Sequence, residues 1–269
     1  MTSWIIPILI LTVLGVLAGV VLSIASKVFE VKGNPLVHRI REELPGINCG
    51  ACGYVGCDSY AAALVEEEGV EPNLCTPGGE TVAQKICQVL DIPFAEMTSK
   101  HAVLLCAGTL DHTEYVMDWQ SLHSCAANKM FYRGRGSCYQ TCLGYGDCAD
   151  SCPYDAITID NGIAIVNRRR CVGCGICVKV CPSNLLQLMT GERLVYVACS
   201  SHAKAKDTRK GCTTGCIACG KCEKVCKEDA IHVDHNLASI DQTKCTQCGA
   251  CVEVCPVNII KIIGEECHV

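Results

Sequence analysis

The sequence predicts an α+β protein that joins a membrane-spanning N-terminal helix, a small cysteine domain and two tandem copies of a cysteine-rich module. Three observations support this prediction. Residues 4–26 carry no charged side chain, and 26 of the 269 residues are cysteine, far above ordinary usage. The stretch that begins at Cys142 also aligns without a gap with the stretch that begins at Cys216.

The cysteine spacing distinguishes among the three chemistries that use this residue so densely, which are disulfide frameworks, structural zinc and iron–sulfur clusters. A C-x2-C-x2-C-x3-C-P run is how bacterial ferredoxins hold 4Fe–4S clusters. Cysteines this close pair poorly as disulfides, and four-ligand zinc sites normally come as two separated pairs. The run occurs at Cys171, Cys174, Cys177, Cys181 and Pro182, at Cys245, Cys248, Cys251, Cys255 and Pro256, and without proline at Cys216, Cys219, Cys222 and Cys226.

The uncharged N-terminal run is long enough to cross a bilayer as a helix. A cleaved signal peptide is the alternative, but no Lys or Arg precedes the run, and the run exceeds the usual apolar region of such peptides. Positive charge follows it, and the positive-inside rule then places the rest of the chain in the cytoplasm. We expect residues 1–28 to be a single-pass anchor in the cell inner (cytoplasmic) membrane, with the cluster domains on the cytoplasmic side.

The segment "NCGACGYVGC" and the later "NLC" predict a small 4Fe–4S domain over residues 35–95. The glycines in the first segment permit turns that point thiolates inward, and "SYAAALVEEEGV" predicts a helix between the third and fourth ligands. A zinc site is the alternative. The expected ligands are Cys49, Cys52, Cys57 and Cys75.

Two ferredoxin modules are expected to follow, over residues 100–190 and 191–269. Within each module, "AITIDNGIAIV" or "AIHVDHNLASI" alternates apolar and polar residues around a turn, which predicts a β-hairpin. Bacterial two-cluster ferredoxins exchange the fourth cysteine of each run between their clusters. That pattern predicts three ligand sets, which are Cys216, Cys219, Cys222 and Cys255; Cys245, Cys248, Cys251 and Cys226; and Cys171, Cys174, Cys177 and Cys152.

The remaining set of the first module is irregular, because Tyr145 stands where the second module has Cys219. Cys138 is the obvious replacement, since only three residues separate it from Cys142. Its counterpart in the second module, Cys212, is surplus there. The expected ligands of this cluster are Cys138, Cys142, Cys148 and Cys181.

Four further cysteines have no partner in these sets. They could hold a sixth cluster, or they could be buried free thiols that pack as small hydrophobic side chains. We therefore expect five 4Fe–4S clusters, and six if the ligands also include Cys106, Cys125, Cys199 and Cys212. Cys87 and Cys267 are interpreted as non-ligands.

No complete catalytic site is recognisable, because the sequence has no dinucleotide-binding glycine motif after a strand, no P-loop and no nucleophile triad. Electron transfer is therefore the expected function. The anchor, the "NCGACGYVGC" domain and the "CLGYGDCADSCPYDAI" and "CIACGKCEKVC" modules together resemble the B subunit family of the Rnf complex, the ion-translocating ferredoxin:NAD oxidoreductase. The resemblance covers nearly the whole chain and is to the cluster-rich form of anaerobes.

That resemblance implies a translocase subunit that takes electrons from reduced soluble ferredoxin and relays them within a membrane complex. The implied partners are soluble ferredoxin and the other membrane and peripheral subunits, including the flavin- and NAD-binding subunit; no nucleic acid is implied. Local basic groups could steer an acidic ferredoxin, although they could equally be solvated loop charge. They are Arg168, Arg169 and Arg170, and Lys204, Lys206, Arg209 and Lys210.

Three alternative functions remain open from the sequence. A membrane-tethered polyferredoxin could serve a hydrogenase or another dehydrogenase. A zinc scaffold would be colourless and would not be reducible. A corrinoid-reducing activator is suggested by the N-terminal cysteine domain, although the tandem ferredoxin modules argue against it.

Overall fold

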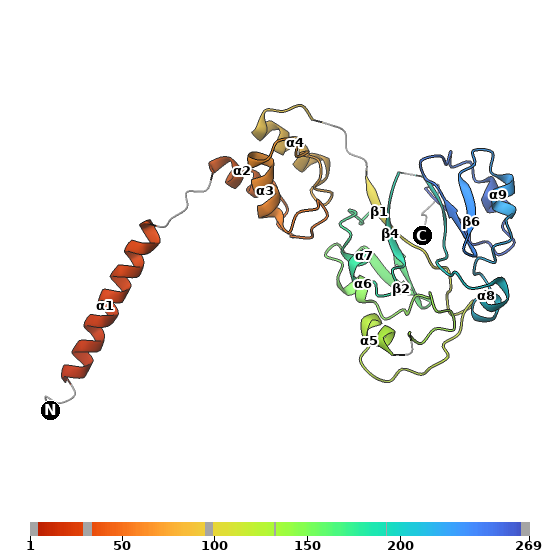
Figure 1. Cartoon of the computed structure of the whole chain (residues 1–269), viewed down its shortest axis with the longest axis horizontal. Coiled ribbons are helices and arrows are strands. Elements are labelled where there is room, and N and C mark those ends of the chain that lie inside the picture. The colour runs from red at the N-terminus through yellow and green to blue at the C-terminus, as the bar shows by residue number, and fades with distance from the viewer. Residues whose placement is uncertain (1–4, 29–33, 95–98, 132, 192, 265–269) are drawn as a thin grey trace.

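The computed structural model describes residues 5–28, 34–94, 99–131, 133–191 and 193–264, and within the first helix it describes the side chains of residues 9–25. The chain runs from that helix through a small helical domain into two modules built from short helices and paired strands (Figure 1). The mixed helix and strand content confirms the predicted α+β class. Cys267 lies outside the described residues.

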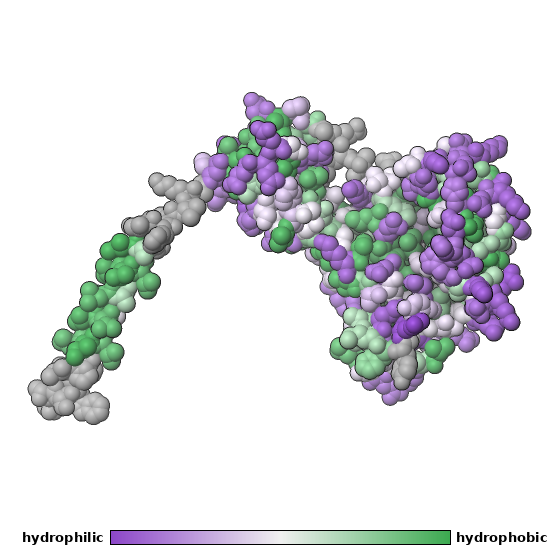
Figure 2. Space-filling view, in the orientation of Figure 1, coloured by the Kyte–Doolittle hydropathy of each residue, from purple (hydrophilic) through white to green (hydrophobic). Residues whose placement is uncertain are grey.

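Helix α1 (Ile5–Val28) begins the described chain. Its large apolar side chains between Leu9 and Ile24 are 50–70% exposed, and Figure 2 shows them as a continuous hydrophobic surface. No helix among the described residues combines the length and apolar character needed to cross a membrane. The expected single-pass anchor over residues 1–28 is therefore not supported by the described part of the chain.

Helices α2 (Pro35–Glu43), α3 (Cys57–Glu66) and α4 (Gly79–Leu90) form the N-terminal domain. Helix α2 begins where Asn34 accepts a hydrogen bond from the N–H of Leu36, with proline at the first helical position. The three helices pack around Ile40, Tyr60 and Ile86, which are almost fully buried. As predicted, a helix separates the third candidate ligand from the fourth.

Module 1 contains two antiparallel strand pairs. Strand β1 (Lys100–Leu104) pairs with β4 (Leu186–Thr190), and β2 (Ile157–Asp160) forms the predicted hairpin with β3 (Ile163–Val166). Helices α5 (Cys125–Met130), α6 (Asp147–Asp150) and α7 (Ile176–Val180) complete it. Its core includes Ala102, Ile157, Leu185 and Leu186.

Module 2 repeats this topology. Strand β5 (Leu194–Val197) pairs with β8 (Ile260–Ile263), and β6 (Ile231–Asp234) forms the second predicted hairpin with β7 (Leu237–Ile240). Helices α8 (Ala205–Gly211), α9 (Lys221–Val225) and α10 (Ala250–Glu253) accompany them. Its core includes Val195, Ile231, Ile259 and Ile260.

Four of the short helices begin in the same way, with a glycine in the left-handed conformation at the N-cap. Glycine adopts this conformation without the steric cost that a Cβ brings. The turn places the third cysteine of each run, or its equivalent, on the buried side of a helix two residues later. The glycines are Gly146, Gly175, Gly220 and Gly249, and the cysteines are Cys148, Cys177, Cys222 and Cys251.

Candidate iron–sulfur sites

The N-terminal domain gathers four cysteines around the start of α3. Burial raises the pKa of Cys75 to about 11; the backbone of Gly78 opposes this rise, and the neighbouring sulfurs of Cys57, Cys52 and Cys49 add to it. The mutual effect of these thiols places them at one site. They are the four cysteines expected from the sequence.

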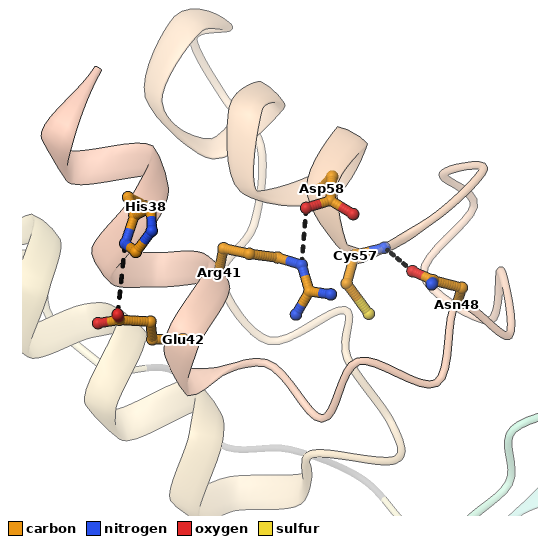
Figure 3. Close-up of polar contacts among 6 residues, drawn as sticks. All are labelled: His38, Arg41, Glu42, Asn48, Cys57 and Asp58. Carbon is orange, nitrogen blue, oxygen red and sulfur yellow. Dashed lines mark hydrogen bonds and ion pairs between the residues drawn. The ribbon is translucent and has the colours of Figure 1, made fainter. Parts of the chain in front are cut away.

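A polar contact fixes the third of these cysteines. The side-chain Oδ1 of Asn48 accepts a hydrogen bond from the N–H of Cys57 at 2.8 Å, as Figure 3 shows. A Cβ at Gly56 would lie 2.9 Å from the same oxygen, so a larger residue there would have to displace the Asn48 side chain from this hydrogen bond. Nearby, Arg41 Nε donates to Asp58 at 2.8 Å and ties α2 to the first turn of α3 (Figure 3).

Module 1 brings Cys152 to the first three cysteines of its ferredoxin run. Burial raises the pKa of Cys177 to about 11, and Cys171, Cys174 and Cys152 raise it further, so these four sulfurs face one another. The N–H of Ala156 donates to Cys152 Sγ at 3.4 Å, and the N–H of Ala102 donates to Cys171 Sγ at the same distance. Hydrogen bonds to the sulfurs are among the features that tune the reduction potential of a bound cluster.

The N-terminal domain contacts module 1 beside this group. Lys179 Nζ donates to the backbone oxygen of Cys49 at 3.1 Å, and Thr76 Oγ1 donates to the backbone oxygen of Gly173 at 3.4 Å. Cys49 also raises the pKa of Cys174, after the larger effect of burial. The cysteine groups of the two domains are therefore neighbours.

In module 2, each of two cavities is bordered by the first three cysteines of one run and the fourth cysteine of the other run. One cavity of 290 Å³, many times the space that one water molecule needs, is bordered by Cys226, Cys245, Cys248 and Cys251. A second, much smaller cavity is bordered by Cys216, Cys219, Cys222 and Cys255. The N–H of Ala230 donates to Cys226 Sγ at 3.4 Å, which repeats the arrangement at Cys152.

The irregular group of module 1 differs from the expectation. The cavity bordered by Cys142, Cys148 and Cys181 is completed by Cys125, and Cys138 is not among its lining residues. Asp147 provides the physical reason, because its carboxylate accepts hydrogen bonds from the N–H groups of Cys125 and Ala126 at 2.7 and 3.0 Å. These bonds hold the start of α5 against the cavity.

Cys125 is one of the four surplus cysteines of the sequence, and nothing in its spacing indicates where it belongs. Its position depends on a carboxylate more than twenty residues away, and the only local indication is Ser124, which caps α5. Cys138 instead lies near Cys199 and Cys212, which raise its pKa after the larger effects of burial and the opposing backbone N–H of Gln140. Cys87 lies apart, with its Sγ 3.9 Å from the Pro93 oxygen.

The cysteine groups have the chemical character that a 4Fe–4S cluster requires. Their sulfurs are clustered in fours, largely surrounded by apolar side chains, and several accept backbone N–H groups. Bound clusters would supply reversible one-electron exchange. Among the described residues, no three His, Cys, Asp or Glu side chains are placed to hold a single metal ion.

Neighbouring groups in a module are linked by one short helix. Cys177 lies within α7 and Cys181 follows its last residue, yet the two cysteines face different groups, about 6 Å apart along the helix axis. The same holds for Cys222 and Cys226 at α9. The two cysteine groups of each module therefore lie close together.

Comparison with known proteins gives matches over most of the chain. Residues 44–77 match a family described as "Putative Fe-S cluster", residues 138–185 and 170–231 match 4Fe-4S dicluster domains, and residues 238–261 match a 4Fe-4S binding domain.

Relatives cover nearly the whole chain. The B subunit of the proton-translocating ferredoxin:NAD(+) oxidoreductase complex of Clostridium ljungdahlii is 39% identical over 90% of this chain and 86% of its own length. The B subunit of the ion-translocating oxidoreductase complex of Methanosarcina acetivorans is 40% identical over 87% of this chain and 89% of its own. The B subunit of the Na(+)-translocating ferredoxin:NAD(+) oxidoreductase complex of Acetobacterium woodii is 39% identical over 95% and 77%.

Proposed function

Since the chain belongs to the B subunit family of the Rnf complexes, the ion-translocating ferredoxin:NAD oxidoreductases, we propose that it accepts electrons from reduced soluble ferredoxin and relays them to other subunits. Membership of the family and its ferredoxin-type domains make it an electron-transfer subunit of such a complex. Three points belong to the proposal: soluble ferredoxin is the electron donor, the cysteine groups act in series, and the flavin- and NAD-binding subunit is the electron acceptor.

The contact between the N-terminal cysteine group and module 1 carries this proposal. A carrier that only stored electrons would not need its separate cysteine domain to dock at a ferredoxin site. Here Lys179 and Thr76 join the two groups through the backbones of Cys49 and Gly173. These contacts support a series in which the N-terminal cysteine group is next to the group of Cys152, Cys171, Cys174 and Cys177 in module 1.

The basic residues of α8 are the better candidate for docking an acidic ferredoxin. Lys206, Arg209 and Lys210 are exposed on this helix, and its last residue precedes Cys212. The second basic group is partly engaged within the protein, because Arg168 donates to the Gly191 oxygen and Arg170 to the Asp155 oxygen. An opposite charge on the partner would then increase the association rate at low salt.

Rapid mixing of reduced ferredoxin with the oxidised full-length chain tests the proposal. We expect fast bleaching of the chain's visible absorption, and a rate at least tenfold lower at low salt when Lys206, Arg209 and Lys210 are all replaced by Glu. Reversal of Arg168, Arg169 and Arg170 is the matched comparison and should have the smaller effect. Absence of electron transfer at any salt concentration would refute ferredoxin as the donor.

Membrane attachment is part of the same proposal. The exposed apolar surface of α1 supports attachment of the chain at the cytoplasmic side of the membrane. Deletion of residues 1–28 should move the chain from the membrane fraction to the soluble fraction without changing its iron content. An unchanged distribution would mean that other subunits alone hold the chain at the membrane.

The rival assignment is a polyferredoxin that serves a hydrogenase or another dehydrogenase, which would use the same cysteine groups. Purification of the native complex separates the two assignments. Co-purifying subunits that carry flavin support the proposal, whereas a co-purifying hydrogenase would replace it.

A further inference from the structure

Four cysteines outside the five groups meet where the two modules adjoin. Cys106 and Cys199 each follow the end of a strand by two residues, β1 in module 1 and β5 in module 2. Cys138 and Cys212 lie four residues before Cys142 and Cys216, the cysteines with which the two aligned stretches begin. We propose that these four cysteines, two equivalent ones from each module, hold a sixth 4Fe–4S cluster, while Cys125 serves the irregular group of module 1.

Gly108 shows that Cys106 and Cys212 are close. A Cβ at this glycine would lie 3.5 Å from Cys212 Sγ and 3.7 Å from Cys106 Sγ, so both sulfurs border the same residue. Thr214 links the same two segments, because its Oγ1 donates to the Ala107 oxygen at 3.3 Å and lies 3.5 Å from Cys212 Sγ. The bridge between Thr113 and Cys212 continues this contact between the modules.

Cys138 and Cys199 are brought to the same place by their neighbours. A Cβ at Gly211 would lie 3.3 Å from the backbone nitrogen of Cys138, so the residue before Cys212 packs directly on Cys138. Ser200, next to Cys199, donates from its Oγ to the Leu105 oxygen at 3.0 Å, beside Cys106. All four cysteines are thus tied to one another through residues adjacent in the chain.

The surroundings of these sulfurs differ from those of cysteines that merely fill space. Cys199 Sγ accepts two backbone N–H groups, from Ser201 at 3.5 Å and from Cys216 at 3.4 Å. In two of the other three, the residue two positions later in the chain also faces the sulfur with its backbone N–H group: Gly108 faces Cys106 and Gln140 faces Cys138. A buried thiol that packs as a small hydrophobic side chain needs no such donors, whereas a thiolate ligand does.

The site lies between groups that the two modules otherwise keep apart. The backbone of Cys142 faces the sulfur of Cys106. On the other side, Cys199 Sγ accepts a hydrogen bond from the N–H of Cys216. Cys142 belongs to the irregular group of module 1 and Cys216 to a group of module 2. The ligand assignment itself does not depend on the proposed function. Its consequence does: a sixth cluster here would connect the electron-transfer sites of module 1 with those of module 2.

Iron and acid-labile sulfide counts on the anaerobically purified full-length chain test the assignment. The wild-type chain should hold about 24 iron atoms, and each of Cys106→Ser, Cys138→Ser, Cys199→Ser and Cys212→Ser should lose about four. Cys87→Ser is the matched control, because this buried cysteine lies outside every group, and it should lose none. These counts need neither ferredoxin nor a partner subunit, so they stand apart from the test of the proposed function.

Double substitutions show which cysteines share a site, because losses add only for independent sites. The pair Cys138→Ser with Cys199→Ser should lose about four iron atoms in total, and the pair Cys138→Ser with Cys125→Ser about eight. The reverse result, eight for the first pair and four for the second, would return Cys138 to the irregular group and overturn the proposal.

A cysteine variant could unfold a whole module and so lose several clusters at once. Native mass spectrometry of the wild-type chain avoids this problem because it needs no variant. Each cluster adds the same mass, so six increments support the sixth site. Five increments would refute it, whatever the variants do.

Discussion

Module 1 and module 2 share their strand pairing and their helix starts, but they supply one cysteine group differently. In module 2, Cys219 lies between Ala218 and Gly220, both at positive φ. In module 1, Tyr145 lies between Gly144 and Gly146, also at positive φ, so the backbone takes the same path without a thiol. Cys125 at the start of α5 fills the missing position from outside the repeat.

In both modules the cavity bordered by three equivalent cysteines is completed by a fourth, and only the place of that fourth cysteine in the chain differs. The segment that carries Cys125 is longer in module 1, where many residues separate β1 from Cys142, than in module 2, where β5 is followed soon by Cys216. That longer segment provides both Cys125 and Ser124, which caps α5 and donates a hydrogen bond to Asp147. It also leaves Cys138 available at the boundary between the modules.

The strongest test of this comparison moves the fourth cysteine from residue 125 to residue 145. Cys125→Ser should lose about four iron atoms. The second substitution Tyr145→Cys should restore them, because residue 145 aligns with Cys219 and has the same positive-φ neighbours. Iron counts and the EPR signal of the reduced protein measure the recovery. If Tyr145→Cys restores nothing, the two modules do not place residues 145 and 219 equivalently.

The carboxylate that positions Cys125 should matter next. Asp147→Ala removes the acceptor of two backbone N–H groups and the Ser124 hydroxyl, so at least half of the iron in this one group should be lost. Asp147→Asn keeps an acceptor and should lose less. The matched control is Lys221→Ala, at the same position in module 2, which should retain all its iron. An intact iron count in Asp147→Ala would show that Cys125 is held by other contacts.

The regular parts of the fold could be predicted from the sequence because their determinants are local. Both hairpins follow from strand alternation around a turn, and the ferredoxin runs carry their own spacing and glycines. The comparisons with relatives confirm the family that the motifs indicate.

The irregular group could not be predicted, because its geometry depends on long-range contacts. Sequence proximity favours Cys138, yet Asp147 brings in Cys125, and the contact of Gly211 with Cys138 draws the latter toward module 2. Neither contact is visible as a spacing. The sequence already groups Cys106, Cys199 and Cys212 as candidate ligands of a sixth cluster, but it gives Cys125 as the fourth, because no spacing indicates that Cys138 lies near Cys199 and Cys212.

Arg135 packs against Tyr145, the tyrosine that aligns with Cys219 of module 2. Its guanidinium lies 3.8 Å from the ring centre of Tyr115 and 4.0 Å from that of Tyr145, and it donates to the Leu143 oxygen at 2.7 Å. Loss of both ring contacts in Arg135→Leu should cost about 2 kcal/mol. The absorption of the clusters should then bleach about ten to thirty times faster in guanidinium, because irreversible loss follows the unfolding rate.

Arg209→Leu is the matched control, because Arg209 is the equivalent residue of module 2 and is exposed. It should bleach at the wild-type rate. Equal acceleration by both variants would mean that the effect comes from lost surface charge and not from stacking on the tyrosines.

The smallest expected effect concerns the link between module 1 and the N-terminal domain. Lys179 donates to the Cys49 oxygen, whereas the equivalent residue of module 2 is Glu253, which could not donate there. An exposed hydrogen bond of this kind contributes about 0.5–1 kcal/mol, so Lys179→Glu should increase local opening by about two- to fivefold. Hydrogen exchange in peptides that cover residues 44–57 measures this opening.

Glu253→Lys should leave the same peptides unchanged. Unaltered exchange in both variants would mean that Lys179 does not hold the N-terminal domain to module 1 in solution. In that case the proposed series of sites would depend on the Thr76 contact alone, and the N-terminal group would be joined to module 1 less firmly than the two modules are joined to each other.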